Sequence, residues 1–189
     1  MEDFSSFTDE ALAKKAPQNM EAFAALIQRY EAKLMRYIFR ISSFCQESAE
    51  EILQDVFLKA WKNLNGFRGD VSFQSWIYRI THNETISVFR KHKSRGMHLS
   101  VELEESLFVP DENSDLTLEF DQKLSAHHVQ IVLEDLPKAH REILVLCYLE
   151  DLSYNEMADI LKCPAGTVAT KVHRAKEAFR ASASYLSPA

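Results

Sequence analysis

Apolar and polar residues follow one another along the first half of this chain with the period of an α-helix. The spacing predicts a short helix over about residues 8–16, ending near Pro17, and a long helix over 20–41. It predicts two more helices over 49–64 and about 72–94. Because no segment alternates convincingly with the two-residue period of a strand, the expected fold class is all-α.

The second half continues in the same way. A helix is expected over 122–135, followed by one that carries Pro137 in its first turn and runs to about Leu149. A short helix after Ser153 and a last helix that starts at Thr167 are then predicted. A short helix, a tight turn and a second helix form the outline of a helix-turn-helix, whose second helix enters the major groove of DNA.

Two Ser-x-x-Glu sequences mark expected helix starts. Ser48-Ala-Glu-Glu51 and Ser153-Tyr-Asn-Glu156 both have the pattern of a capping box, in which the serine and the glutamate bond free amides of the first turn. Each precedes an apolar run, so we expect each to begin a helix.

Charge divides the chain into three parts that match the expected domains. Residues 1–95 hold 14 basic and 12 acidic residues, residues 96–121 hold none and 8, and residues 122–189 hold 8 of each. The middle part therefore carries more than the whole net charge of −6, and it is expected to be an acidic linker between two small helical domains. That net charge predicts weak binding of the free chain to DNA, although local basic patches can still bind.

Composition and motifs exclude several classes of protein. The chain has no apolar run long enough to cross a membrane and no secretion signal at its start, so a cytoplasmic protein is expected. No catalytic or phosphate-binding motif occurs, and no His, Cys or carboxylate cluster has metal-ligand spacing, so neither enzyme activity nor a cofactor is expected. Cys45, Cys147 and Cys163 are interpreted as small buried apolar residues.

The predicted last helix has two distinct faces. Its apolar residues Val168, Val172, Ala175 and Phe179 share one face. The opposite face carries polar and basic side chains that can reach base edges and phosphates, with further basic residues nearby. These residues are Thr167, Thr170, Lys171, Arg174, Lys176 and Arg180.

A mixture of aromatic, amide and basic residues on the 72–94 helix suits unpaired DNA, because rings stack on bases and cations neutralise the strand. Its members are Tyr78, Arg79, His82, Asn83, Phe89, Arg90, Lys91 and Lys93. The alternative is a solvated basic face above an aromatic core. Trp76 lies in the apolar stripe and is expected in the core, whereas Tyr78 and Asn83 fit either interpretation.

The 49–64 helix has an acidic and amide-bearing edge made of Glu51, Gln54 and Asp55, with Leu58 beyond them. Such an edge usually faces solvent. Beside Phe57, it can also dock a basic partner.

These residues together resemble the extracytoplasmic-function (ECF) group of sigma-70 family sigma factors. AEEILQDVFLKAWKNLNGFRGDVSFQSWIYRITHN resembles region 2, and LEDLPKAHREILVLCYLEDLSYNEMADILKCPAGTVATKVHRAKEAFR resembles region 4. The resemblance covers about residues 20–95 and 125–182. It implies a non-enzymatic protein that binds core RNA polymerase, directs it to specific promoters and assists promoter melting.

The resemblance also implies roles for individual residues. In region 2, Glu51, Gln54, Asp55 and the adjoining Phe57 would dock on core polymerase. The loop that begins with Phe67 and Arg68 would read the −10 element together with the helix after it. Tyr78 and Asn83 would capture a flipped base, and the basic residues Arg79, Arg90, Lys91 and Lys93 would hold the strand.

In region 4, the helix from Thr167, with Thr170, Lys171, Arg174 and Lys176, would read the −35 element. Ala169 and Ser87 depart from the family pattern, and Ala169 removes one expected −35 contact. Two alternatives remain open at this point: a stand-alone helix-turn-helix regulator, and an interaction module without DNA binding.

Family habit implies an anti-sigma factor as a further partner, often one held at the membrane. The acidic linker is open to two interpretations, a solvated tether or a segment that occupies a nucleic-acid channel of polymerase by imitating the charge of RNA. The sequence does not name the promoter, the regulon or the inducing signal.

Overall fold

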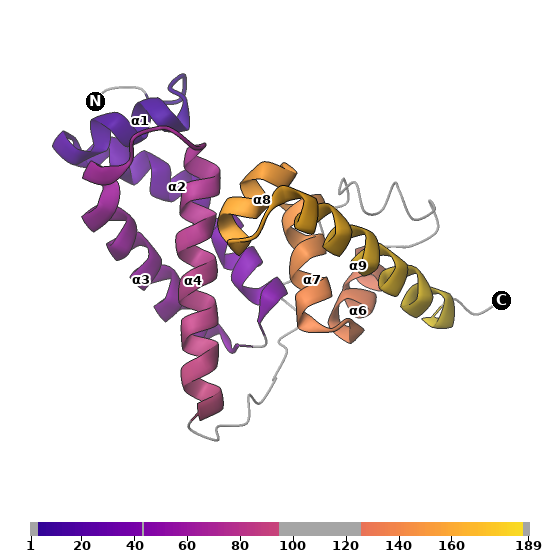
Figure 1. The fold of residues 1–189 in the computed structure, drawn as a ribbon. Coiled ribbons are helices and arrows are strands. Elements are labelled where there is room, and N and C mark those ends of the chain that lie inside the picture. The colour runs from indigo at the N-terminus through magenta and orange to yellow at the C-terminus, as the bar shows by residue number, and fades with distance from the viewer. Residues whose placement is uncertain (1–3, 43, 95–125, 187–189) are drawn as a thin grey trace. The chain divides into compact units, whose positions relative to one another are not determined.

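The structure of the 189-residue chain is a computed structural model that describes residues 4–42, 44–94 and 126–186 (Figure 1). Every regular element within these ranges is helical, which confirms the predicted all-α class. The chain divides into two compact units, Met1–Leu103 and Glu104–Ala189. The predicted linker, 96–121, lies outside the described residues, so the expected domain boundaries stay predictions.

The first unit is built from helices α1 (Asp9–Lys15), α2 (Met20–Ile41), α3 (Gln46–Asn63) and α4 (Phe73–Ser94). A 3₁₀ turn, Ala16–Gln18, contains Pro17 and links α1 to α2. The predicted helix over 20–41 has the observed bounds of α2. Helices α2, α3 and α4 pack against one another around a core rich in aromatic residues, with Trp76 buried as expected.

Helix α3 begins earlier than predicted, and its expected capping box is absent. The N-cap residue is Cys45 in an extended conformation, without a side-chain cap hydrogen bond. Ser48 therefore lies one turn inside the helix, where its hydroxyl is 3.4 Å from the Cys45 sulfur. The prediction of a helix start at Ser48 is wrong because the backbone turns into the helix three residues before the matching motif.

The second unit contains α6 (Ala126–Asp135), α7 (Lys138–Leu144), α8 (Tyr154–Leu161) and α9 (Ala165–Leu186). The expected helix from Pro137 to about Leu149 is divided: Pro137 is the N-cap residue, and a π-helical turn, Val145–Leu149, replaces the last part of α7. Helix α9 packs on α6, α7 and α8, so it closes the unit's core.

The predicted capping box at Ser153 is confirmed. The Ser153 hydroxyl accepts a hydrogen bond from the Glu156 amide, and the Glu156 carboxylate accepts one from the Ser153 amide at 3.0 Å. Helix α8 ends at Lys162 in the left-handed conformation, with φ of 52°. Helix α9 starts at Ala165, two residues before the expected Thr167, because the Pro164 carbonyl already accepts the amides of Thr167 and Val168.

Candidate polymerase and nucleic-acid interfaces

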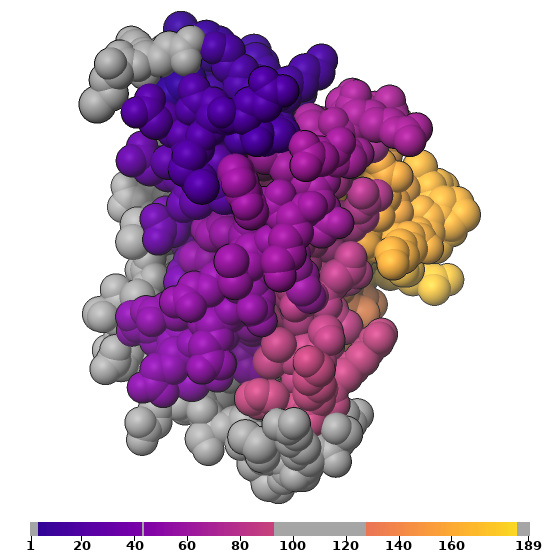
Figure 2. Space-filling model, turned by 90° about the vertical axis from the view of Figure 1, so that its left-hand side faces the viewer, coloured from indigo at the N-terminus to yellow at the C-terminus, as the bar shows by residue number. Residues whose placement is uncertain are grey.

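The acidic edge predicted on α3 lies on the surface of the first unit. Glu51, Gln54 and Asp55 are exposed, and Phe57 beside them is half-buried. Leu58 follows on the same side with 55% of its surface exposed, which is unusual for a leucine. The opposite side of α3 is buried through Ala49, Ile52, Leu53, Val56 and Ala60. Figure 2 shows the first unit from the side on which α3 lies in Figure 1.

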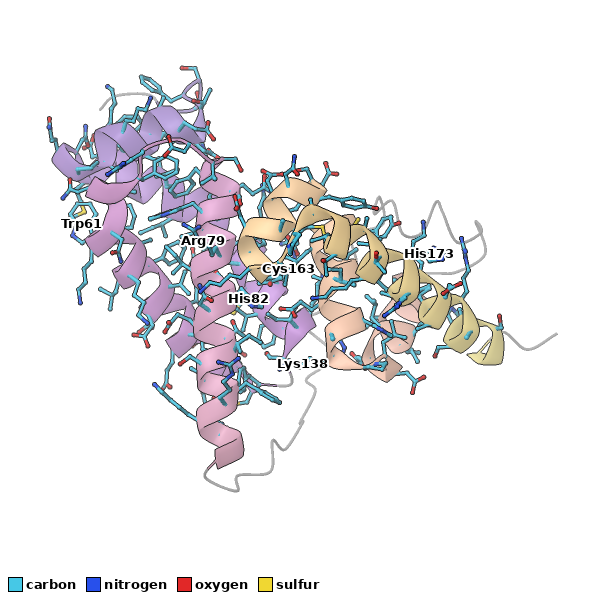
Figure 3. The ribbon with its side chains drawn as sticks, viewed as in Figure 1. Trp61, Arg79, His82, Lys138, Cys163 and His173 are labelled. Atoms are coloured by element: carbon cyan, nitrogen blue, oxygen red, sulfur yellow. The ribbon has the colours of Figure 1, made fainter. Side chains whose placement is uncertain are left out.

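Side-chain contacts near the end of α3 add to its packing on α2 and α4. Lys59 of α3 forms an ion pair with Glu84 of α4. Trp61, near the end of α3, packs its ring against Phe23 of α2, with 5.0 Å between the centroids (Figure 3). The exposed acidic side chains therefore belong to a helix that is held in place by both α2 and α4.

The loop between α3 and α4 carries one predicted DNA residue outward and buries another. Arg68 is exposed, and Gly69 adopts a positive φ of 78°, which turns the chain tightly. Phe67 points inward with 9% exposure, and its ring centroid lies 5.7 Å from that of Phe73 and 5.4 Å from that of Trp76. Phe67 was predicted to read the −10 element, but here its ring is packed in the core and anchors the loop.

Tyr78 also belongs to the core. Its exposure is 0%, and its ring packs edge-on against Tyr37 of α2 at 5.2 Å. Stacking on a flipped base requires an open ring face, so the structure contradicts that interpretation of Tyr78 and supports the core alternative. One turn further, Asn83 is exposed, and Arg79 is half-buried on the same helix (Figure 3).

The basic end of α4 is partly described. Arg90 and Lys91 are exposed, while the side chain of Lys93 lies outside the described residues. His82 is half-buried, with its Nδ1 atom 3.5 Å from the hydroxyl of Tyr37. The residues that α4 presents together to solvent are therefore the amide of Asn83 and cations on either side of it.

Helix α9 has the two faces that its sequence predicts. Val168, Val172, Ala175 and Phe179 are buried, with exposures of 0–2%. Thr167, Thr170, Lys171 and Arg174 are all exposed. The Thr170 hydroxyl donates to the Gly166 carbonyl at 3.1 Å, so its proton is used within the helix.

Lys176 does not join that face. It is half-buried, and its Nζ atom lies over the ring of Tyr148 at 5.5 Å from the centroid, a cation–π contact with the π-helical turn. The side chain of Lys171 reaches back to the turn before α9, where its Nζ atom is 4.0 Å from the Cys163 sulfur. Of the residues predicted to read the −35 element, the structure thus exposes Thr167, Thr170, Lys171 and Arg174 together.

Sequence reasoning missed His173 on this surface. It is exposed and lies three residues after Thr170, so the two are neighbours on the helix (Figure 3). Its Nε2 atom is 3.6 Å from a carboxylate oxygen of Glu177. The signal was present in the helical spacing, because both residues fall on the polar side of the predicted helix.

A second missed residue, Glu10, has no local sequence signal. Its carboxylate on α1 accepts a hydrogen bond from the backbone amide of Phe73 at 3.2 Å. The two residues are 63 positions apart, so only the packed structure brings them together.

The prediction of three buried cysteines is wrong. Cys45 is exposed, Cys147 and Cys163 are half-buried, and none of the three forms a disulfide. A hydrogen bond with Ser48 lowers the pKa of the Cys45 thiol. Among the described residues, no group of His, Cys, Asp and Glu could hold a metal ion, and no helix has the length and apolar character to cross a membrane.

Comparison with known proteins identifies the class of protein that these surfaces define. The family model Sigma-70 region 2 matches residues 26–95, and the model Sigma-70, region 4 matches residues 129–179. The first match contains α3 and α4 with the acidic edge. The second contains α7 and α8 and extends into α9 as far as residue 179. The chain belongs to the sigma-70 family of sigma factors.

Relatives over nearly the whole length are ECF sigma factors. The ECF RNA polymerase sigma factor SigW of Bacillus subtilis is 32% identical over 178 residues, which cover 88% of this chain and 90% of the relative. The ECF RNA polymerase sigma-E factor of Haemophilus influenzae is 30% identical over 176 residues, which cover 90% of this chain and 92% of that relative. The resemblance to the ECF group is thereby confirmed.

Solved structures share the fold. CnrH, solved in complex with the cytosolic domain of CnrY, matches with a TM-score of 0.65 and 24% identity over 92% of this chain and 95% of CnrH. The sigma factor RpoE of Bartonella quintana, solved with the anti-sigma factor NepR, gives the same score and identity over 85% and 95% of the two chains. These matches support the two-unit helical architecture.

Proposed function

We propose that this alternative sigma factor engages polymerase and promoter DNA through three exposed surfaces: the acidic edge of α3, the polar side of α4 with its preceding loop, and the outer face of α9. Its general function, that of an alternative sigma factor in transcription initiation, follows from the family and its ECF relatives. The observation that carries the proposal is the clean division of α9, whose one face is fully buried while four polar or basic residues are exposed.

Core polymerase is the proposed partner of the α3 edge. Glu51, Gln54 and Asp55 offer two carboxylates and an amide along one side of the helix. Leu58 adds an exposed apolar contact at the end of this row. A partner surface that combines basic side chains with an apolar spot would complement it, because charge sets orientation and apolar burial adds affinity.

The −10 strand is the proposed ligand of the α4 surface. Asn83 can donate to and accept from a base edge, and its exposure leaves both groups available. Arg68, Arg79, Arg90 and Lys91 supply charge for the strand backbone. Phe67 and Tyr78 support these residues from the core and make no direct contact in this proposal.

The −35 element is the proposed ligand of α9. Thr167 and Thr170 lie in the first turns of the helix, the part that approaches base edges in helix-turn-helix proteins. Lys171 and Arg174 follow within reach of bases or phosphates. Lys176 contributes through its cation–π contact to the position of α9 and not to DNA binding.

Three further features complete the proposal. The protein acts with polymerase in the cytoplasm, performs no reaction of its own and requires no cofactor. An anti-sigma factor, in many ECF systems one held at the membrane, would mask these surfaces until a signal arrives; the solved complex of RpoE from Bartonella quintana with NepR is a precedent in a protein of the same fold.

Reconstitution with core RNA polymerase tests the function. Promoter-specific initiation is expected when the purified chain is added to core enzyme on genomic DNA fragments, and no specific start sites are expected without it. The Asp55→Lys variant is the matched control for docking. Tight promoter binding by the chain alone at physiological salt would instead support a stand-alone regulator.

A further inference from the structure

The start of helix α4 is capped from two directions. The first amides of a helix have no partner within the helix itself. The Ser72 hydroxyl accepts from the Ser75 amide at 3.1 Å, which is an ordinary local cap. The Phe73 amide instead donates to the Glu10 carboxylate of α1 at 3.2 Å.

Glu10 is well suited to this position. A carboxylate at a helix N-terminus is favoured by the helix dipole, and a hydrogen bond to a charged acceptor is stronger than one to a neutral acceptor. Glu10 is half-buried, so water screens the contact less than at an open surface. Helix α1 thereby supplies a group that α4 needs and that the loop sequence before it does not provide.

Helix α1 is itself fixed on α2 by the neighbouring carboxylate. Asp9 accepts a hydrogen bond from the Tyr30 hydroxyl at 2.5 Å and pairs with Arg29 at 2.6 Å. Arg29 also donates to the backbone carbonyls of Phe4 and Phe7, at 2.7 and 2.9 Å. Burial and the Asp9 contact raise the pKa of Tyr30, so its hydroxyl stays a donor.

The two carboxylates converge on one point of the core. The Tyr30 ring, held by Asp9, packs on the Phe73 ring with 5.3 Å between centroids, and Glu10 holds the Phe73 amide. The same Phe73 ring contacts Phe67, the inward anchor of the loop. Gly69 of that loop lies beside Lys14 of α1. A Cβ atom placed at Gly69 would be 3.9 Å from the Cε atom of Lys14, which is ordinary van der Waals contact.

We propose that Glu10 is a positioning residue for −10 recognition: its hydrogen bond to Phe73 fixes the start of α4 and, through it, the loop that presents Arg68. This inference rests on the proposed role of that loop and of Asn83 in reading the −10 strand. Losing the bond frees the first turn of α4 and lets the loop take several conformations. Discrimination among −10 sequences then falls, while docking through α3 is unaffected.

Hydrogen exchange in the full-length chain tests the bond directly. Protection of the Phe73 amide is expected to fall roughly three- to thirtyfold in Glu10→Ala, the range of a lost helix cap. Glu10→Gln keeps an acceptor oxygen at the same reach and should retain most of the protection. The amide of Ile38, a fully buried residue of α2, serves as the internal measure of global stability.

Selection by the holoenzyme tests the consequence. Core polymerase with each variant is allowed to bind a single-stranded DNA library that has a random six-nucleotide window, and the bound pool is sequenced. Glu10→Ala and Glu10→Asp, which is one methylene too short to reach Phe73, should enrich the preferred sequence several-fold less than the wild type. Glu10→Gln should stay close to it, as should the control Glu31→Ala, which removes an exposed carboxylate from α2.

The outcomes separate this inference from the function on which it rests. Equal enrichment by Glu10→Ala and the wild type, or an unchanged protection of the Phe73 amide, would overturn the positioning role. Loss of enrichment together with a matching loss of protection at Ile38 would also overturn it, because general unfolding would then explain the effect. If Asn83→Ala and Arg68→Ala leave enrichment unchanged, the proposed −10 role fails, whereas the exchange result still decides whether Glu10 caps α4. Should Glu10→Ala fail to fold, the comparison of Glu10→Asp with Glu10→Gln decides the matter alone.

Discussion

The two helices proposed to bind DNA, α4 and α9, use aromatic and polar residues in different ways. Helix α9 lies on the outside of its unit, and its residues divide cleanly into a buried apolar face and an exposed polar face. Helix α4 packs against both α2 and α3, and two of its residues that fit either core or surface from the sequence, Tyr78 and Asn83, have opposite environments. The residue types alone therefore predict which face of α9 is exposed, but they do not predict this for α4.

The difference has a simple physical cause. A helix with one packed face follows a single apolar stripe, so helical spacing assigns each residue to the core or to solvent. A helix packed on two sides buries more of its circumference, and aromatic residues outside the main stripe also become buried. Tyr78 meets Tyr37 in this way.

The largest expected effect concerns Tyr78. Truncating a fully buried aromatic side chain costs about 3–5 kcal/mol, so Tyr78→Ala should lower the free energy of unfolding of the first unit by that amount. Asn83→Ala, at an exposed position on the same helix, should change it by no more than about 0.5 kcal/mol. Urea denaturation of both variants measures the difference in stability. An unchanged midpoint for Tyr78→Ala would contradict the buried position of this ring.

Reversing the charge of the α3 edge should have the next largest effect. Asp55→Lys is expected to weaken binding to core polymerase by about 1–3 kcal/mol, the scale of a hydrogen bond to a charged group. The matched control is Glu31→Lys, which makes the same charge change on an exposed position of α2. Competition for core enzyme against a labelled sigma factor measures the affinity of both variants. If Asp55→Lys and Glu31→Lys bind core polymerase equally well, the α3 edge is not part of the interface.

The basic residues of α9 should differ from one another. Lys171→Ala or Arg174→Ala should reduce −35 affinity and lower the slope of log affinity against log salt by about one, because one phosphate contact is lost. Lys176→Ala should leave the slope unchanged, since its ammonium group rests over Tyr148. A salt titration of holoenzyme binding to closed promoter DNA distinguishes them, and a lower slope for Lys176→Ala would contradict the separation.

The smallest effect compares two identical-looking motifs. Ser153→Ala removes a true N-cap and should cost about 0.5–2 kcal/mol of unfolding free energy in the second unit. Ser48→Ala lies inside α3 and should cost less than about 0.5 kcal/mol in the first. Thermal denaturation of the two variants is the measurement, and equal losses would mean that Ser48 caps α3 after all.

The same pair shows how far the sequence could predict the fold. The helical spacing predicted α2 with its observed bounds, both faces of α9 and the exposed edge of α3. It could not distinguish a Ser-x-x-Glu sequence that caps a helix from one that lies inside a helix. The extended backbone at Cys45, and not Ser48, determines where α3 begins. Helix existence depends on many residues, whereas a helix start depends on one.

The candidate sites were predictable to the extent that they depend on local spacing. Lys171 and Arg174 are exposed as a DNA contact requires, and the spacing predicted this. Asn83 is exposed as well, although the spacing left it open between surface and core. Lys176 and Glu10 depend on partners elsewhere in the chain, Tyr148 and Phe73, and no local pattern shows which partner a long side chain will meet.

We propose that α4 acts in strand opening and α9 in duplex binding. Permanganate footprinting of the promoter bubble, run beside closed-complex binding on matched templates, tests it with Asn83→Ala and Arg174→Ala. Asn83→Ala should bind closed DNA normally but open it less, with a loss of about 1–3 kcal/mol in base recognition, whereas Arg174→Ala should lose closed-complex affinity. If Asn83→Ala opens both native and pre-mismatched promoters as the wild type does, Asn83 is only a surface amide and the claim for α4 is wrong.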